Sequence, residues 1–413
     1  MTSNDQARHA GNANLFWTMW LIAAISLPLI LGGCSTRKVA AVPSTAVTLA
    51  RPPVDNVRFV LGLNFDKFAD EYLLSLQRET TYLESIGHKG PLPATSYLAI
   101  SGGGGNGAFG AGLITGWTGS GRPVFKTVTG ISTGALIAPF AFLGPKYDPI
   151  LRQTYTTTND AGIYHKRWIV KAFMSDAMAD TAPLQAMVKR LITSEFLAEI
   201  AAEYAKGRLL LVGTTDLDEQ RGVIWNMTAI AASNDPDALG LFRKILLASA
   251  SIPGVFPPVM IDVTVDGKPY QEMHVDGGAT AEVFIYPPRF HLREIAAANG
   301  YDRERTLYII RNDRLDADWA NVNRRTLSIA SKAVSSLIHT QGNGDLYRMY
   351  LTAERDHLDY NLAFIPADFT AVSKSEFDPV FMTQLFARGQ EMAAKGYPWQ
   401  KYPPGYAPNP VAK

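Results

Sequence analysis

Short apolar runs alternate with longer stretches of helical spacing along most of the chain. Runs of this kind are typical of buried strands; they lie at 97–100, 124–128, 209–212, 223–226, 273–275, 306–310 and 360–365. The stretches between them include 134–142 and 183–206, where apolar residues recur with a helical period. Strands that alternate with helices predict an α/β fold with a largely parallel sheet, which binds ligands at the carboxyl ends of its strands.

The pattern is different at the two ends of this region. Residues 34–60 are rich in Pro, Ala, Thr and Ser without apolar periodicity, which predicts a flexible tether. Apolar residues between Phe65 and Leu83 follow helical spacing and predict an amphipathic helix, with Asn64 as its N-cap. Residues 397–413 form a Pro-rich tail, so the expected folded domain is 61–396.

A glycine-rich stretch, "AISGGGGNGAFGAG" at 99–112, directly follows the first apolar run. Its spacing fits the dinucleotide-binding motif G-x-G-x-x-G, but residues 116–130 contain no acidic residue to hold a ribose. No Lys-Ser or Lys-Thr pair follows at the spacing of a Walker-type phosphate loop. We therefore expect an anion-binding turn, in which backbone N–H groups and the start of a helix stabilise an oxyanion.

The next strand leads into "TVTGISTGALIAPF", which contains Gly130-Ile131-Ser132-Thr133-Gly134. G-x-S-x-G between a strand and a helix is typical of a nucleophile elbow, where a sharp turn exposes the serine. The motif also arises by chance in glycine-rich chains, so the assignment of a nucleophile depends largely on the anion-binding turn before it. Together the two motifs predict that Ser132 is a nucleophile.

A serine needs a base, and no histidine of the sequence follows a strand in a suitable position. His274 lies within a predicted strand, but Asp276 ends the same strand and is followed by Gly277 and Gly278, which allow close approach of another loop. We expect Asp276 to take the serine proton directly. The alternative is an ordinary turn aspartate, because Asp-Gly is a common hairpin sequence.

The three motifs in this order resemble the patatin-like phospholipase family, over about Ser96–Tyr286 and loosely to about Gly396. The resemblance implies a three-layer α/β fold and a Ser-Asp dyad of Ser132 and Asp276. It also implies that Gly103, Gly104 and Gly105 donate the N–H groups of the oxyanion hole. The chain departs from the family pattern at Asn106, where many members have Arg or Lys, and at Glu282, where many have Asn.

Composition narrows the possible partners. With 39 Lys and Arg against 38 Asp and Glu, and no long basic run, the chain lacks the charge pattern of a nucleic-acid-binding protein. No His/Cys cluster or calcium-loop spacing is present, so neither a metal nor a cofactor is expected. The expected partner is a membrane lipid substrate, and the sequence does not specify an oligomeric state.

The N-terminus contains an apolar run, Leu15–Leu31, followed at once by "LGGCS". This resembles a bacterial lipoprotein signal with a lipobox ending at Cys34, the single cysteine of the chain. The prediction is a signal peptide at 1–33 and membrane anchoring through lipidated Cys34; an uncleaved membrane anchor is the alternative. Ser35, by analogy with such lipoproteins, favours the outer membrane, with the protein facing the periplasm.

The expected activity is therefore that of a lipid acyl hydrolase of the phospholipase A or lysophospholipase type, acting through an acyl-enzyme. One alternative is an α/β-hydrolase esterase with a Ser-Asp-His triad, which would need His339 or His357. The other is a non-catalytic lipoprotein that only binds lipids. The helix after Ser132 and the sequence "IPGVFPPVMI" are expected to help line an acyl channel.

Overall fold

The computed structural model describes residues 37–166, 177–316 and 322–406. Cys34 and the predicted signal peptide at 1–33 lie outside these residues. Within the described parts of the chain, no helix combines the length and apolar character needed to cross a bilayer.

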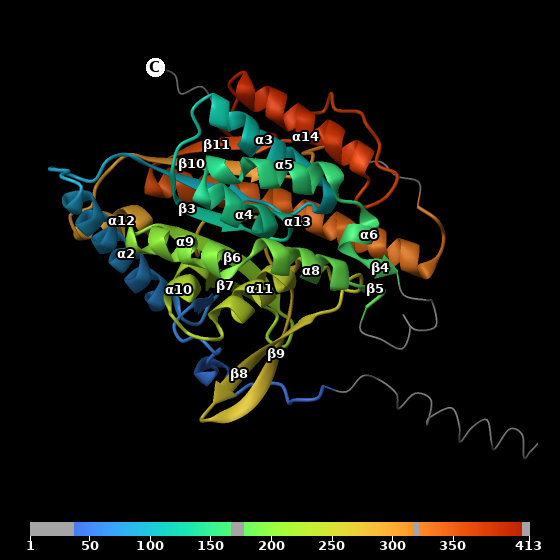
Figure 1. Ribbon diagram of the computed structural model, residues 1–413, viewed down its shortest axis with the longest axis horizontal. Coiled ribbons are helices and arrows are strands. Elements are labelled where there is room, and N and C mark those ends of the chain that lie inside the picture. The colour runs from blue at the N-terminus through green and yellow to red at the C-terminus, as the bar shows by residue number, and fades with distance from the viewer. Residues whose placement is uncertain (1–36, 167–176, 317–321, 407–413) are drawn as a thin grey trace, which may run out of the picture.

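A mixed sheet forms the centre of the fold (Figure 1). Within the described residues it has nine strands, seven of them in the order β1-β7-β6-β3-β2-β10-β11, while β9 pairs with β6 and β8 with β9. Pairing is parallel from β6 through β3, β2 and β10 to β11 and antiparallel elsewhere. The strands are β1 (Arg58–Val60), β2 (Thr95–Ile100), β3 (Phe125–Gly130), β6 (Leu209–Asp216), β7 (Arg221–Asn226), β8 (Val259–Val265), β9 (Lys268–Asp276), β10 (Arg305–Arg311) and β11 (Leu358–Phe364).

Helices cover both faces of this sheet (Figure 1). A separate two-stranded ribbon joins β4 (His165–Lys166) to β5 (Ala179–Asp180). The helices of the described residues are α2 (Phe65–Ser85), α3 (Gly107–Gly119), α4 (Thr133–Leu143), α5 (Asp148–Thr157), α6 (Asp160–Ile163), α8 (Ala182–Leu191), α9 (Ser194–Ala205), α10 (Met227–Ala232), α11 (Ala238–Ser249), α12 (Leu292–Ala298), α13 (Thr326–Asp356) and α14 (Pro379–Ala394), with short 3-10 turns η1 (Val47–Leu49), η2 (Gly104–Asn106), η3 (Pro145–Tyr147) and η4 (Gly277–Ala279).

Successive residues of the central strands enter two different hydrophobic cores. In β2, Leu98 and Ile100 pack in the core that includes residues of α3, α4 and α14, whereas Tyr97 and Ala99 pack in the core that includes residues of α2, α12 and α13. A strand that is apolar on both sides reads as a continuous hydrophobic run, because its residues alternate between the two faces. The predicted α/β fold with a largely parallel, helix-flanked sheet is confirmed.

The seven predicted strands all occur, but the sequence pattern did not reveal β1 and β8. The predicted helix at 183–206 is divided into α8 and α9, because the Thr193 hydroxyl accepts from the Phe196 N–H at 3.2 Å and begins a new helix. Asn64 precedes α2 as expected, yet its side chain does not cap the helix. It turns back and accepts from the Val60 N–H at 2.7 Å.

The segments predicted as tether and tail contact the domain where the structure describes them. Arg51 pairs with Thr264 of β8, Val54 and Val57 are buried, and β1 lies within the segment predicted as tether. Near the other end, the Trp399 ring packs against Trp117 with centroids 4.8 Å apart. Both segments therefore contribute to the packed structure beyond the predicted boundaries at 60 and 397.

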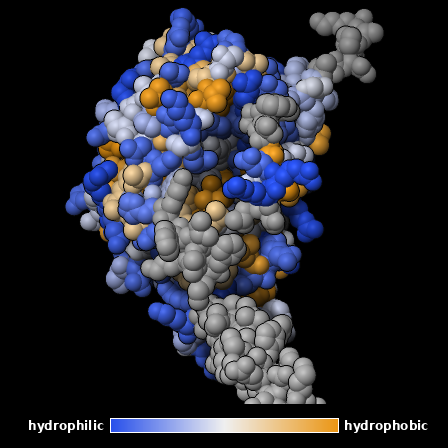
Figure 2. All heavy atoms as spheres, turned by 90° about the vertical axis from the view of Figure 1, so that its right-hand side faces the viewer, coloured by the Kyte–Doolittle hydropathy of each residue, from blue (hydrophilic) through white to orange (hydrophobic). Residues whose placement is uncertain are grey.

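Figure 2 shows the face of the molecule that lies on the right in Figure 1. Hydrophobic residues on this face gather in small patches between hydrophilic ones. Single exposed apolar side chains are normal on soluble surfaces. The described surface that is visible in this view shows no broad apolar face.

Candidate active site

Ser132 occupies the sharp turn between β3 and α4. Its backbone has φ 54° and ψ −125°, a conformation that side-chain-bearing residues rarely adopt. Strain of this kind costs of the order of 1–3 kcal/mol and persists only where the surrounding structure enforces it. Here the Ser132 N–H donates to Ser249 Oγ at 3.0 Å, and Ser249 donates in turn to the Gly213 carbonyl at 2.7 Å. Helix α11 and strand β6 thus hold the turn in place.

Gly130 and Gly134 permit this turn because nothing larger fits. A Cβ atom on Gly134 would lie 2.6 Å from the Ser101 carbonyl oxygen and still closer to that of Ile100. A Cβ atom on Gly130 would lie 2.7 Å from the Cα atom of Ala135. These neighbours are backbone atoms of the turn itself and of β2, so they cannot move aside cheaply. The two glycines of the motif therefore bring the turn against the start of the glycine-rich loop.

Asp276 is the last residue of β9 and is 5% exposed. Its N–H donates to the Ser251 carbonyl at 2.9 Å, and its Oδ1 accepts from the Gly278 N–H at 2.8 Å. Burial raises the pKa of the Asp276 carboxyl to about 7, although hydrogen bonds from Ser132 and the Gly278 N–H act in the opposite direction. A carboxyl with such a pKa is a much stronger base than an exposed aspartate.

The structure brings Ser132 and Asp276 together. The serine hydroxyl is close enough to the carboxylate to lower its pKa, while Oδ2 is buried and lacks a hydrogen bond of normal geometry. The two observations fit a hydroxyl that faces the carboxylate at a long distance or a poor angle. Catalytic hydrogen bonds are often of this kind in the absence of substrate.

The loop before α3 presents its backbone toward the same place. Gly103 and Gly104 have φ values of 142° and 53°, which glycine adopts at little cost. Among the described residues, the N–H groups of Gly103 and Gly104 have no hydrogen-bond acceptor. The Gly105 N–H lies close enough to the Glu376 carboxyl to lower its pKa. Two of the three predicted oxyanion donors are thus without an acceptor, and the third lies beside a carboxyl.

Glu376 is exposed as a residue, but its Oε1 lies against Gly104. Desolvation and the nearby Asp160 charge raise the pKa of the Glu376 carboxyl, and the Gly105 N–H partly offsets this rise. A carboxyl oxygen therefore lies beside the loop that carries the predicted oxyanion donors. Nothing in the sequence indicated Glu376, because it lies far along the chain in a polar loop.

Gly277 and Gly278 form η4 directly after Asp276. A Cβ atom on Gly277 would lie 2.6 Å from the Gly213 carbonyl oxygen, and one on Gly278 would lie 2.6 Å from Glu282 Oε2. Both glycines therefore allow close approach, as the sequence predicts, to β6 and to the Glu282 side chain.

An apolar pocket begins beside the nucleophile. It is lined almost entirely by hydrophobic surface and includes Thr133, Leu136, Phe140, Tyr155, Met187 and Phe377. Helix α4 contributes to it, as expected for the helix after Ser132. The segment "IPGVFPPVMI" does not, because none of its residues lines this pocket.

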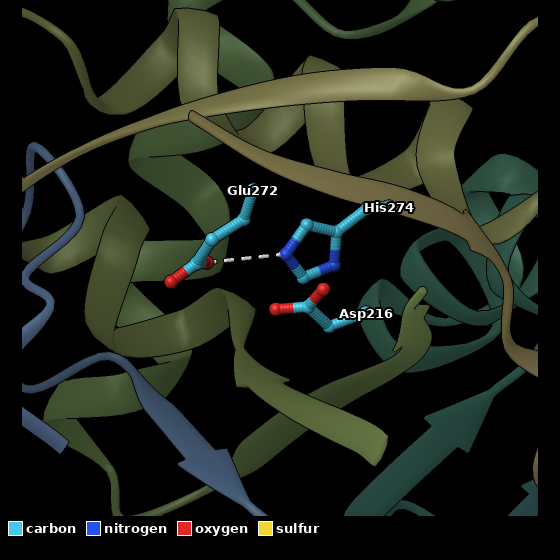
Figure 3. A group of neighbouring side chains, drawn as sticks. All are labelled: Asp216, Glu272 and His274. Atoms are coloured by element: carbon cyan, nitrogen blue, oxygen red, sulfur yellow. Dashed lines mark hydrogen bonds and ion pairs between the residues drawn. The ribbon is translucent and has the colours of Figure 1, made fainter. Parts of the chain in front are cut away.

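The histidines of the triad alternative are engaged elsewhere. His339 Nδ1 lies 2.9 Å from Asp313 Oδ2, and His357 Nε2 lies 2.8 Å from Arg293 Nη1. His274, although two residues from Asp276, belongs to a buried cluster with Asp216 and Glu272 (Figure 3). In the described structure, no hydrogen bond joins any of these three histidines to Ser132.

The three residues of this cluster have side chains of the kind that bind metals, with one candidate atom of each within 4.8 Å of the others. Their atoms already have partners, however. Glu272 forms an ion pair with Arg58 of β1, and its Oε2 lies 3.3 Å from His274 Nε2. His274 Nδ1 lies 3.0 Å from Thr214 Oγ1, which accepts from the Trp225 indole N–H.

Both imidazole nitrogens therefore have a hydrogen-bonding partner, Thr214 at Nδ1 and Glu272 at Nε2. Burial disfavours ionised Glu272, but hydrogen bonds from His274 and Arg58 outweigh it and lower the pKa of this carboxyl to about 2. The cluster acts as an internal network that fastens β1, β6 and β9 behind Asp276.

Comparison with known families identifies the part of the chain that carries these residues. The patatin-like phospholipase family matches residues 98–287, a range that includes the glycine loop, Ser132 and Asp276. The chain contains a patatin-like phospholipase domain. The match to this family supports lipid acyl hydrolase activity for the patatin-like domain. The solved structure of VipD from Legionella pneumophila is a distant match, with 11% identity and a TM-score of 0.32, covering 73% of this chain and 67% of that one. The comparison with curated proteins found no match.

Proposed function

We propose that the patatin-like domain hydrolyses acyl esters of lipids through a dyad of Ser132 and Asp276. The observation that carries this proposal is the strained Ser132 turn facing a buried carboxylate oxygen that has no well-formed hydrogen bond. A serine is a weak nucleophile at its ordinary pKa and needs a base within reach. Asp276, with its raised pKa, is suited to accept the proton near neutral pH.

In the first half of the reaction, Ser132 Oγ attacks the ester carbonyl carbon while its proton moves to Asp276. The carbonyl oxygen becomes an oxyanion, which the N–H groups of Gly103, Gly104 and Gly105 stabilise. Collapse of the intermediate breaks the bond to the alcohol, which leaves with the proton from Asp276. In the second half, water gives a proton to Asp276 and attacks the acyl carbonyl carbon. Collapse of this second intermediate breaks the bond to Ser132 Oγ, which takes the proton back from Asp276 as the fatty acid is released.

The apolar pocket supports a lipid as the source of the acyl group. Its lining begins at Thr133, the residue next to the nucleophile, and continues over apolar side chains of α4, α5 and α8. Burial of each methylene of a chain stabilises binding by about 0.8 kcal/mol. An acyl chain in this pocket would extend from the carbonyl carbon that Ser132 attacks.

A fluorophosphonate probe tests the nucleophile. We expect it to label the full chain at Ser132, with no labelling in Ser132→Ala and loss of lipid ester hydrolysis by at least about 1,000-fold. Ser233→Ala, which alters a serine at the end of α10, is the matched control and should label like the wild type. Labelling that persists in Ser132→Ala would contradict the proposal.

We also propose, from the sequence, that Cys34 is lipidated and holds the domain at the bacterial outer membrane, facing the periplasm. An anchor of this kind would keep the site near its substrate. Cells grown with labelled palmitate should incorporate it into the wild-type chain and into Ser35→Ala, but not into Cys34→Ala. Equal labelling of Cys34→Ala would exclude this modification.

A further inference from the structure

Glu282 lies between the two loops of the site, with its side chain buried. Its Oε1 is 2.5 Å from the position a Cβ atom would take on Gly102, and its Oε2 is 2.6 Å from that position on Gly278. The Gly102 N–H also donates to the Glu282 carbonyl at 3.2 Å. Gly102 precedes the predicted oxyanion donors and Gly278 donates to Asp276, so one side chain touches both halves of the machinery.

Arg311 holds this side chain from the other side. It is 1% exposed, its Nη1 lies 3.1 Å from Glu282 Oε1, and its Nη2 lies 3.0 Å from Asp313 Oδ2. Arg311 ends β10, which pairs in parallel with β2, the strand that leads into the glycine loop. The guanidinium therefore fixes Glu282 relative to the same edge of the sheet that carries the predicted oxyanion donors.

The charges around Glu282 are mostly negative. Asp276 Oδ1 lies 3.2 Å from the Cβ position of Gly278, which Glu282 Oε2 also approaches. Asp313 lies beyond Arg311, where it pairs with His339, and Asp345 of α13 accepts from the Glu282 N–H at 2.7 Å while it pairs with Arg348. Arg311 is the cation that contacts Glu282 itself, and the charge of Asp276 disfavours the ionisation of Glu282.

We propose that Glu282 is a positioning residue of the hydrolytic site, which joins the glycine loop to the turn after Asp276 and holds the two at a fixed spacing. The inference rests on the proposed function. Burial and the Asp276 charge raise the pKa of the Glu282 carboxyl to about 8, although Arg311 opposes this.

The test compares kcat and KM for ester hydrolysis by Glu282→Gln and the wild type across pH. At pH 9, where Glu282 is ionised, the amide removes its ion pair with Arg311, so looser positioning should lower kcat by about tenfold with little change in KM. Below about pH 7 the Glu282 carboxyl is itself neutral, so the difference in kcat should become smaller. The acidic limb should stay in place, because the pKa of Glu282 lies above that of Asp276. A kcat within about twofold of the wild type at pH 9 would overturn the proposal.

Two further variants separate positioning from general stability. Glu79→Gln removes another buried carboxylate, paired with Arg303 and Lys126 away from the site, and should leave kcat at pH 9 unchanged. Glu282→Asp keeps the charge but shortens its reach, so kcat should fall while the limb stays near that of the wild type. If Glu282→Gln does not fold, a kcat for Glu282→Asp equal to the wild type overturns the proposal. If Ser132→Ala keeps its activity in the same assay, the proposed function itself fails.

Discussion

Ser132 lies just after β3, and Asp276 is the last residue of β9. These two strands do not pair with each other, but both pair with β6. Gly130 of β3 lies opposite Val212, and Asp276 of β9 lies opposite Thr214. Strand β3 runs parallel to β6 and β9 runs antiparallel to it. The shared neighbour brings the hydroxyl and the carboxylate to one place, although a long stretch of chain separates them.

We expect Asp276→Asn to be inactive but more stable than the wild type at pH 8. Because burial raises the pKa of Asp276 to about 7, the folded state binds a proton more tightly than the unfolded state. This contribution to stability is present below about pH 4 and is lost as the pH rises through about 7. Urea unfolding should show a difference of up to about 4 kcal/mol at pH 8 that disappears below about pH 4. Equal stability at pH 8 would contradict the raised pKa.

The wild-type enzyme should lose activity as the pH falls below about 7. The base must be ionised to accept the Ser132 proton, and the pKa of Asp276 is about 7. We expect kcat/KM to decrease about tenfold per pH unit on the acidic side and to level off above pH 8. A soluble ester should be used, so that lipid ionisation does not contribute. If the acidic limb of the pH profile had its midpoint near pH 4, the base would be an ordinary, well-solvated carboxylate.

Gly134→Ala should abolish labelling of Ser132. Its Cβ atom would collide with the carbonyl oxygens of Ile100 and Ser101, so the turn must shift away from the glycine loop. Overpacking of this kind costs about 1–3 kcal/mol. Gly119→Ala is the matched control, because a Cβ atom there meets no other heavy atom within 4 Å. Similar labelling of both variants would show that close approach at Gly134 is not required.

Met187→Trp should narrow the apolar pocket and shift the preference toward short acyl chains. The larger ring projects into space lined by α4, α5 and α8. We expect kcat/KM for long-chain esters to fall at least about tenfold, with butyrate esters hydrolysed as by the wild type. Rates for a series of chain lengths measure this effect. A uniform loss for all chains would place the acyl group elsewhere.

Glu376→Gln should increase activity above neutral pH. The Glu376 carboxylate lies close enough for the Gly105 N–H, a donor that the proposed oxyanion needs, to lower its pKa. A neutral amide competes less well for this donor, so kcat/KM at pH 8 should rise by about three- to tenfold. At low pH, where Glu376 is protonated, the two enzymes should converge. A decrease at pH 8 would mean that the carboxylate assists the reaction.

The order of motifs was enough to predict the fold class and to place Ser132 and Asp276 at the ends of strands. Strands apolar on both faces and flanked by helices leave few arrangements other than a parallel sheet between two helical layers. The strand β1 was missed because its Pro-rich surroundings hide a short segment that is buried only through its pairing with β7 and its packing against distant parts of the chain. The ion pair between Arg58 and Glu272 behind Asp276 could not be predicted from the sequence for the same reason.

The sequence by itself determined which side chains are available: a serine between glycines, an aspartate before glycines, and a loop with few side chains. Only the tertiary structure decided what surrounds them. Burial, not residue type, raises the pKa of Asp276, and the positions of Glu282 and Glu376 depend on β10 and on the loop before α14. Local motifs follow from short-range backbone geometry, whereas basicity and contact depend on the dielectric and the charges contributed by distant segments.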